Sequence, residues 1–164
     1  MVMDDGQVLL CGGISDDGRP TNATFLFDPE KRDEDPFERV DDMHHARAGH
    51  QLIMPSTGGV YAIGGYDNLT VGGNSTIEAV SNIERFDPAN NTWVLFNASM
   101  IAPRAGHVLM EMDNGEVLAI GGYDPETGVG IRMTEKFIIA SKRWISAGQM
   151  EMGRVGGIFT GLSE

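Results

Sequence analysis

Short apolar runs alternate with polar, glycine-containing stretches along the whole chain. Three of these runs end in a pair of glycines: Val8–Gly13, Val60–Gly65 and Val117–Gly122. Each has four apolar residues before the glycines, which is the length of a strand and too short for a membrane span. Such a run is typical of a strand that is buried on both faces. The pattern therefore predicts short strands joined by tight turns, and no membrane insertion.

The apolar runs belong to a larger repeat with four features. A methionine is followed four residues later by Arg-x-Gly, then come the run ending in Gly-Gly, an aromatic residue, and a tryptophan. The features recur in this order three times, so we expect three copies of one supersecondary unit. The marks that define the repeat are Gly12, Gly13, Gly64, Gly65, Gly121, Gly122, Arg47, Arg104, Arg154, Trp93 and Trp144.

The spacing of the marks divides residues 1–164 into copies. Copy 1 is expected over about 1–46, copy 2 over about 47–103 and copy 3 over about 104–153. Residues 154–164 are expected to form the first strand of a next copy. Copy 1 is expected to lack the start of its first strand, because Met1–Gly6 aligns with Met110–Gly115.

Each copy is expected to fold as a four-stranded antiparallel sheet. Asn114-Gly115 lies between two apolar segments, and this pair favours a hairpin with a type I′ turn. One such sheet cannot bury both of its faces. The copies are therefore expected to stack side by side, with the tryptophans filling the gap between neighbours.

The order Arg-x-Gly-His, apolar strand with Gly-Gly, aromatic-Asp-Pro and Trp resembles the kelch repeat, whose period is ~50 residues. The resemblance implies an all-β fold, a kelch-type β-propeller segment of about three four-stranded antiparallel blades in an incomplete ring. Three positions depart from the pattern: Phe37 for Trp, Ile138-Ile139 for Asp-Pro, and Gly157 for His. Propellers have four to eight blades, so we expect a fragment of a longer propeller or self-association through open blade edges.

The resemblance implies two functions of different classes. Most kelch proteins serve as interaction platforms, so the first hypothesis is a non-enzymatic scaffold module that presents its loops to a protein partner. The second is a fragment of a kelch-type propeller enzyme, an oxidase or epimerase acting on a carbohydrate or small molecule. The loop between Tyr66 and Ser81 is about six residues longer than its counterparts. Long loops on a rigid scaffold often carry binding function.

No residue is assigned a catalytic, cofactor-binding or metal-binding role. His50 and His107 recur with the repeat, while His44 and His45 are adjacent in an expected loop. Cys11, the single cysteine, stands in a strand where a small apolar residue belongs, and it excludes an internal disulfide. We therefore expect no metal site and no cofactor.

The charge is strongly acidic and unevenly distributed. The net charge is -12, and residues 1–42 contain 12 acidic and 4 basic side chains. No nucleic-acid partner is expected, because binding a phosphate backbone needs a basic face. The acidic stretch from Asp28 to Asp42, with Asp33-Glu34-Asp35 at its centre, is either a solvated loop or a patch that steers a basic partner.

The acceptor motif for N-glycosylation, Asn-x-Ser/Thr, is unusually frequent. Five of the eight asparagines begin one, against roughly 0.8 expected by chance from the Ser and Thr content. The candidate sites are Asn22, Asn68, Asn74, Asn90 and Asn97. Asn90 is discounted, because Asn-Asn-Thr also suits the turn before Trp93. The motifs favour an extracellular or secretory-pathway protein. A cytoplasmic protein is the alternative, because Met1–Gly6 shows no targeting signal.

Overall fold

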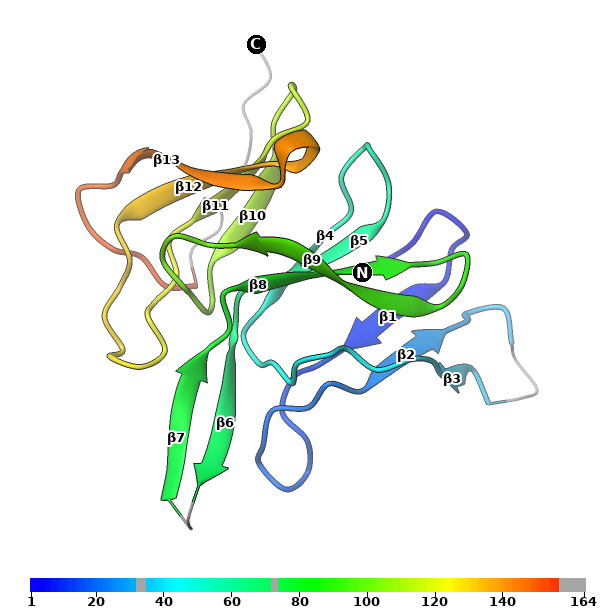
Figure 1. The fold of residues 1–164 in the computed structure, drawn as a ribbon. Coiled ribbons are helices and arrows are strands. Elements are labelled where there is room, and N and C mark those ends of the chain that lie inside the picture. The colour runs from blue at the N-terminus through cyan, green and yellow to red at the C-terminus, as the bar shows by residue number, and fades with distance from the viewer. Residues whose placement is uncertain (32–34, 72–73, 157–164) are drawn as a thin grey trace.

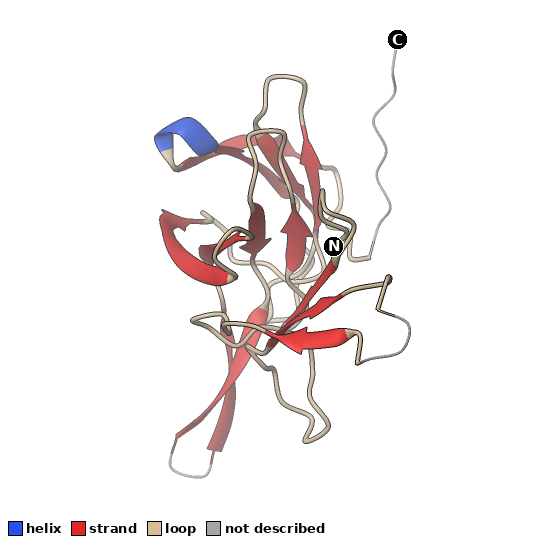
Figure 2. Cartoon of the chain, turned by 90° about the vertical axis from the view of Figure 1, so that its right-hand side faces the viewer, coloured by secondary structure: helices blue, strands red, loops and turns tan. Residues whose placement is uncertain are grey.

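The structure is a computed structural model that describes residues 1–31, 35–71 and 74–156. Within these residues the chain is built of β-strands, with one short 3-10 helix at Ile139–Ser141 (Figures 1 and 2). No helix of the described part is long and apolar enough to cross a membrane. The all-β prediction is confirmed. Outside the described residues lie most of the strand expected over 154–164, with Gly157, and the acidic residues Asp33 and Glu34.

The strands form three sheets, named blades 1, 2 and 3, and a separate hairpin. All pairings are antiparallel, and the strands of each blade follow chain order from the first to the outermost. Blade 1 contains β1 (Val8–Cys11), β2 (Thr24–Phe27) and β3 (Phe37–Arg39). Blade 2 contains β4 (Gln51–Ile53), β5 (Val60–Ile63), β8 (Asn82–Asp87) and β9 (Thr92–Ser99). Blade 3 contains β10 (Val108–Glu111), β11 (Val117–Ile120), β12 (Met133–Ile138) and β13 (Arg143–Gln149).

Blade 1 differs from the other two in its first strand. Where the others have a full strand, an isolated antiparallel bridge joins Val2 to Val8. The outer aromatic pairs agree with the repeat, because Phe27 pairs with Phe37 as Phe86 pairs with Trp93 in blade 2. Phe37 therefore takes the tryptophan position, as the sequence predicted.

The turn at Asn114-Gly115 is in the predicted place but has a different type. The N–H of Met112 donates to the Glu116 carbonyl and the N–H of Gly115 donates to the Met112 carbonyl, each at 2.8 Å. Gly115 has a φ of 75°, whereas Asn114 is not among the described non-glycine residues with positive φ. A type I′ turn needs positive φ at both residues, so that prediction is wrong. The loop is one residue longer and uses a type I turn followed by glycine.

The hydrophobic core lies between the blades. Leu9 and Leu26 of blade 1 pack in one cluster with Phe86 and Trp93 of blade 2. A second cluster joins blades 2 and 3 in the same way, and it contains Tyr61, Ile63, Ile83, Val117, Phe137 and Trp144. The tryptophans fill the gaps between neighbouring blades, as the sequence predicted. Trp93 also donates its indole N–H to the hydroxyl of Thr24 in blade 1, at 3.0 Å.

Burial of the glycine-terminated strands depends on the number of neighbouring blades. In β5 of the middle blade, Val60, Ala62 and Ile63 are fully buried and Tyr61 is 4% exposed. In β1 of blade 1, by contrast, Leu10 is 43% exposed. The prediction of burial on both faces therefore holds for the blade that has a neighbour on each side.

The long connection between β5 and β8 folds into a two-stranded hairpin. Its strands are β6 (Tyr66–Val71) and β7 (Asn74–Ala79), and they pair with each other outside the blade 2 sheet. Figure 1 shows the hairpin extending away from the three blades. Gly72 and Gly73 at its tip lie outside the described residues. The extra residues of copy 2 therefore form regular structure.

Candidate functional site

The glycine pairs hold the segment that follows each blade through the backbone. The second glycine of each pair donates its N–H to the carbonyl of the repeat arginine that follows its blade: Gly13 to Arg47 at 2.9 Å, Gly65 to Arg104 at 2.8 Å, and Gly122 to Arg154 at 2.7 Å. A Cβ on the first glycine would lie 2.5–2.6 Å from the same oxygens, as at Gly12, Gly64 and Gly121. We name this contact the glycine–carbonyl clasp. It accounts for the glycine marks as structural residues.

Arg47 is buried with a carboxylate that sequence analysis missed. Its guanidinium lies 2.7 Å from Glu84, and both side chains are fully buried. Glu84 also accepts the backbone N–H groups of His44 at 2.6 Å and His45 at 3.1 Å. Burial works to raise the pKa of Glu84, but the His44 N–H and the Arg47 charge outweigh it, so the pKa lies below its usual value. The pair fixes the loop before β4 onto blade 2.

Blade 3 repeats this arrangement. Arg104 lies 2.7 Å from Glu135, again with both side chains fully buried, and Glu135 accepts the N–H groups of Ile101 and Ala102. Burial lowers the pKa of the Arg104 guanidinium, while Glu135 acts in the opposite direction. Arg154 is exposed, and among the described residues its carbonyl accepts the Gly122 N–H of the clasp. The missed glutamates carry a sequence signal, since each stands two residues before the aromatic mark of its copy.

The two histidines of the repeat and the single cysteine are shielded from solvent to different degrees: His107 is buried, whereas His50 and Cys11 are half-buried. The Cys11 sulfur lies 3.7 Å from Nε2 of His50, and burial raises the pKa of the Cys11 thiol to about 12. Burial likewise lowers the pKa of His50 to about 4 and that of His107 to about 3. At neutral pH the thiol is protonated and both imidazoles are uncharged, which suits packing rather than nucleophilic chemistry. In the described part of the chain, no three His, Cys, Asp or Glu side chains are placed to hold a metal ion.

One side of the molecule gathers the longer connections. The β6–β7 hairpin, the β1–β2 connection (12–23) and the β11–β12 connection (121–132) lie on the same side in Figure 1, which we name the hairpin face. A hollow of about 250 Å³ on one flank of the hairpin is lined by His45, Asp67, Glu78, Ala79, Val80, Ser81 and Asn82. A second hollow of about 240 Å³ is lined by Ala79, Ala102, Pro103, Asp124, Glu126 and Ile131.

The hairpin is acidic at its base. Asp67 and Glu78 are directly opposite each other in the β6–β7 register, and both line the first hollow. Like charges that face each other across a strand pair are unfavourable. Ile77, one residue further along β7, is 49% exposed. Successive side chains of a strand point to opposite faces, so the hairpin presents Ile77 on one face and the Asp67 and Glu78 carboxylates on the other. An exposed apolar side chain outside the blades is suited to contact rather than to core packing.

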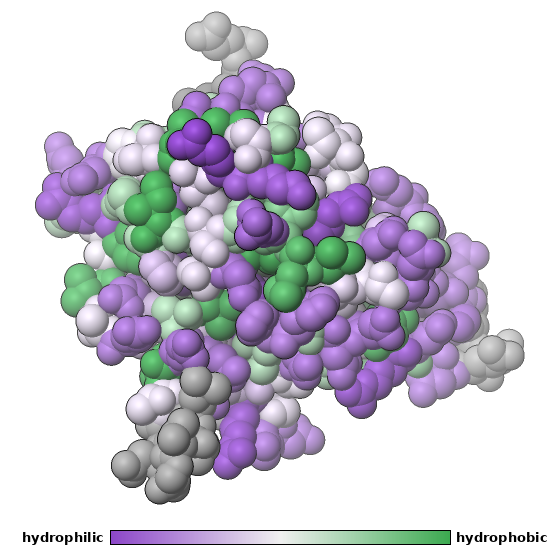
Figure 3. All heavy atoms as spheres, viewed as in Figure 1, coloured by the Kyte–Doolittle hydropathy of each residue, from purple (hydrophilic) through white to green (hydrophobic). Residues whose placement is uncertain are grey.

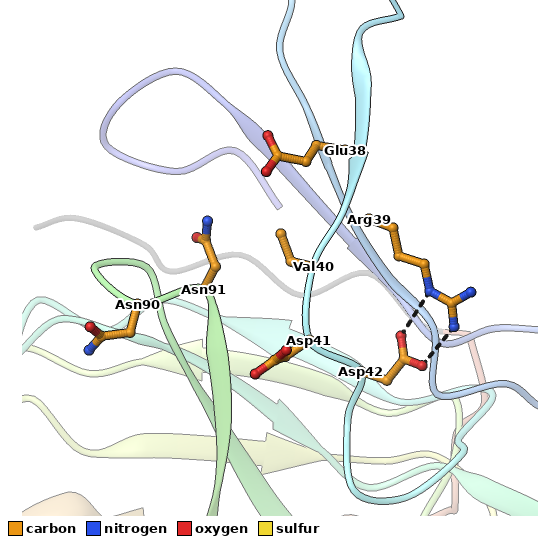
Figure 4. Close-up of a pocket in the computed structure, with 7 residues that line it drawn as sticks. All are labelled: Glu38, Arg39, Val40, Asp41, Asp42, Asn90 and Asn91. Atoms are coloured by element: carbon orange, nitrogen blue, oxygen red, sulfur yellow. Dashed lines mark hydrogen bonds and ion pairs between the residues drawn. The ribbon is translucent and has the colours of Figure 1, made fainter.

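A separate groove holds the end of the acidic stretch. It encloses about 550 Å³ between the end of β3 and the β8–β9 turn, and Figure 4 shows Asn90 and Asn91 opposite Glu38 and Val40. Asp42 accepts hydrogen bonds from the Arg39 guanidinium, at 2.7 Å for the shorter one. The carboxylates of Glu38 and Asp41 make no hydrogen bond to the described residues. The groove therefore keeps two unpaired negative charges at the outer rim between blades 1 and 2.

The structure does not gather the candidate glycosylation sites into one place. Asn22 lies in the β1–β2 connection, Asn68 and Asn74 in the hairpin, Asn90 in the β8–β9 turn and Asn97 in β9. Asn90 lines the acidic groove. The structure does not describe the side chain of Asn74.

Blades of antiparallel strands, stacked through inter-blade tryptophans and glycine–carbonyl clasps, define the β-propeller class. The fold matches the solved structure of YjhT with a TM-score of 0.74, over 94% of this chain and 52% of that chain, at 16% sequence identity. The kelch motif family matches residues 57–97. Over 123 residues the chain is 34% identical to Kelch-like protein 31 of Danio rerio. The chain belongs to the kelch-repeat family, as the sequence predicted.

The match covers only part of each relative. The alignment with Kelch-like protein 31 spans 73% of this chain and 18% of that protein, and the chain spans about half of the solved YjhT chain. At 16% identity the likeness to YjhT concerns the fold alone. The kelch propeller is a fold that supports protein-interaction scaffolds in general.

Proposed function

We propose that the chain is a non-enzymatic, protein-binding scaffold module that presents its hairpin face to a protein partner. The observation that carries this proposal is the β6–β7 hairpin, inserted in blade 2 on a connection that is about six residues shorter in the other copies. The buried residues of β5 and β8 in blade 2 pack against the neighbouring blades. The hairpin does not fill a gap between blades, so its place in the sequence is best explained by contact with another molecule.

The base of the hairpin is held in a defined position. Tyr66 and Ala48 exchange two backbone hydrogen bonds of 2.9 Å, and Val80 donates its N–H to the Gly65 carbonyl at 3.0 Å. A surface held in this way loses little conformational freedom on binding, which favours affinity. The exposed Ile77, and the carboxylates on the other face of the hairpin, are therefore presented in a fixed arrangement by the rigid blades.

Site-specific photo-crosslinking tests the proposal. A photoreactive amino acid is placed at Ile77, or at Val94 as the control, because both are about half exposed and Val94 lies on the outer strand of the same blade. We expect a defined protein adduct in the cells that make the chain, formed from position 77 and not from position 94. The purified adduct partner should then bind the unmodified chain.

Shortening the hairpin provides the second arm. Residues 67–78 are replaced by a short Gly-Ser linker, which keeps the Tyr66–Ala48 contact. We expect the dissociation constant for that partner to rise at least about tenfold, equivalent to ~1.4 kcal/mol, with an unchanged thermal midpoint. Equal affinity of the shortened and complete chains would exclude the hairpin face as the binding surface.

We further propose that the chain self-associates through the uncovered faces of blades 1 and 3. Leu10 is 43% exposed on blade 1, whereas Ala62, at the equivalent position of blade 2, is fully buried in the cluster shared with blade 1. Leu10 therefore stands at a position that a neighbouring blade covers elsewhere in the chain. Sedimentation velocity should show a mass that rises with concentration. A monomer at all concentrations would argue against this part of the proposal.

A further inference from the structure

Asn97 has no structural role that the fold can explain. It lies in β9, its side chain is exposed, and its amide makes no hydrogen bond to the described residues. Asparagine is disfavoured in strands, because its side chain competes for backbone hydrogen bonds. Ser99, the hydroxyl residue of the same Asn-x-Ser motif, is also exposed and without a hydrogen bond in the described part. Both polar groups of this motif therefore remain available.

The other motifs that can be compared are engaged in the fold. Asn22 donates its amide to the Met43 carbonyl at 2.9 Å, and the hydroxyl of its partner Thr24 is fully buried and accepts the Trp93 indole N–H. Asn90 donates its amide to the Asp87 carboxylate at 2.7 Å across the β8–β9 turn. These residues hold their own loops together. The two hairpin motifs include side chains outside the description and do not enter the comparison.

We propose that Asn97 is the site of N-linked glycosylation in this chain. In the transfer, the amide nitrogen of Asn97 forms a bond to the anomeric carbon of a lipid-pyrophosphate-linked oligosaccharide. The bond from that carbon to the pyrophosphate oxygen breaks, the lipid pyrophosphate leaves, and the nitrogen loses one proton. The excess of motifs, five against roughly 0.8 expected, supports passage through a glycosylating compartment independently of the structure.

The position of Asn97 also gives the glycan a physical role. β9 is the outermost strand of blade 2, so one of its edges has no partner strand in the sheet. Val94 and Leu95 are 54% and 47% exposed on this strand, and Figure 3 shows an apolar area where β9 crosses the front of the molecule. An exposed apolar edge strand is a template for aggregation. A glycan at Asn97 covers the C-terminal half of this edge.

Isotope-labelled deglycosylation measures the occupancy of each site. The complete chain is produced in the secretory pathway of a eukaryotic cell and treated with an amidase that converts each glycosylated asparagine to aspartate in heavy-oxygen water. Peptide mass spectrometry then reads the label. We expect the label at Asn97 and none at Asn22. The same measurement on protein from its own cells is expected to give the same pattern.

Three variants distinguish the motif from the residue. Asn97→Gln and Ser99→Ala should each remove one glycan and increase light scattering on warming, whereas Ser99→Thr should retain both the glycan and the solubility. Asn97 without label in either material overturns the proposal, and so does equal occupancy of Asn97 and Asn22. The outcome is independent of the hairpin experiment, because β9 and the hairpin are separate surfaces.

Discussion

Replacing Gly65 with alanine tests whether close contacts explain the second glycine of the pair, and the same chain offers a matched position. Gly65 has a φ of +94°, where an L-residue costs about 1–2 kcal/mol. Its Cβ would also lie 2.7 Å from the Ala48 carbonyl oxygen and 3.0 Å from backbone and Cβ atoms of His50. Relieving such contacts requires shifts of the neighbouring backbone, which costs about 1–3 kcal/mol more. Gly65→Ala is therefore expected to lower the free energy of unfolding by roughly 2–5 kcal/mol.

Gly13 is the control, because it holds the same place in blade 1. Its φ is +93°, but a Cβ there would meet no atom within 4 Å. Gly13→Ala should therefore show only the backbone part, about 1–2 kcal/mol. Urea denaturation of both variants at low protein concentration gives the two free energies, provided that the slopes agree. Equal losses for the two variants would refute the steric argument and leave only the backbone conformation.

Three further expectations follow from the inter-blade contacts. Arg104→Ala leaves its carboxylate partner buried and should lower the free energy of unfolding by about 3–5 kcal/mol; Arg154→Ala, at the exposed mark, should leave it unchanged within error in the same denaturation experiment. Thr24→Val removes the acceptor of an indole N–H and should cost about 1–2 kcal/mol, whereas Thr134→Val, at the equivalent position of blade 3, should cost less because its hydroxyl has no hydrogen bond in the described part. The pKa of His107 is about 3 in the folded chain and 6.5 in the unfolded chain, so the unfolded state binds more protons between these pH values. The free energy of unfolding should therefore fall by up to ~1.4 kcal/mol per pH unit on acidification. His107→Phe should reduce this pH dependence in denaturation midpoints measured from pH 7 to pH 4, and an unchanged dependence would contradict the role given to His107.

The repeat could be predicted from the sequence because its marks answer local requirements. The first glycine of each pair stands where a carbonyl oxygen would lie within 2.6 Å of a Cβ, and tryptophans stand where two sheets meet. Both structural requirements recur at a fixed spacing along the chain, so the residues that meet them can be recognised from the sequence alone. The copy boundaries near residues 46, 103 and 153 stay predictions.

The buried carboxylates could not be predicted in the same way. The segment Ile83-Glu84-Arg85-Phe86 places two charged residues between two apolar ones, and charged side chains normally lie in solvent. Glu84 is buried because the loop before β4 supplies Arg47 and two backbone N–H groups. These partners are about 40 residues away in sequence, so the segment alone does not reveal them, and the only signal is the recurrence of glutamate two residues before the aromatic mark. In the sequence the hairpin could likewise be recognised only as added length in copy 2. Its two strands pair with each other outside the blade 2 sheet, so the repeat pattern does not predict them.

The acceptor side of the glycine–carbonyl clasp consists of a main-chain oxygen, which every amino acid possesses. Arg154 illustrates this, since its side chain is exposed while its carbonyl still accepts the Gly122 N–H at 2.7 Å. Substitutions at the acceptor position therefore leave this backbone hydrogen bond intact, whereas the donor glycines cannot be substituted freely. A few small residues per blade are therefore enough to hold this architecture together, which is consistent with a TM-score of 0.74 to a chain at 16% sequence identity.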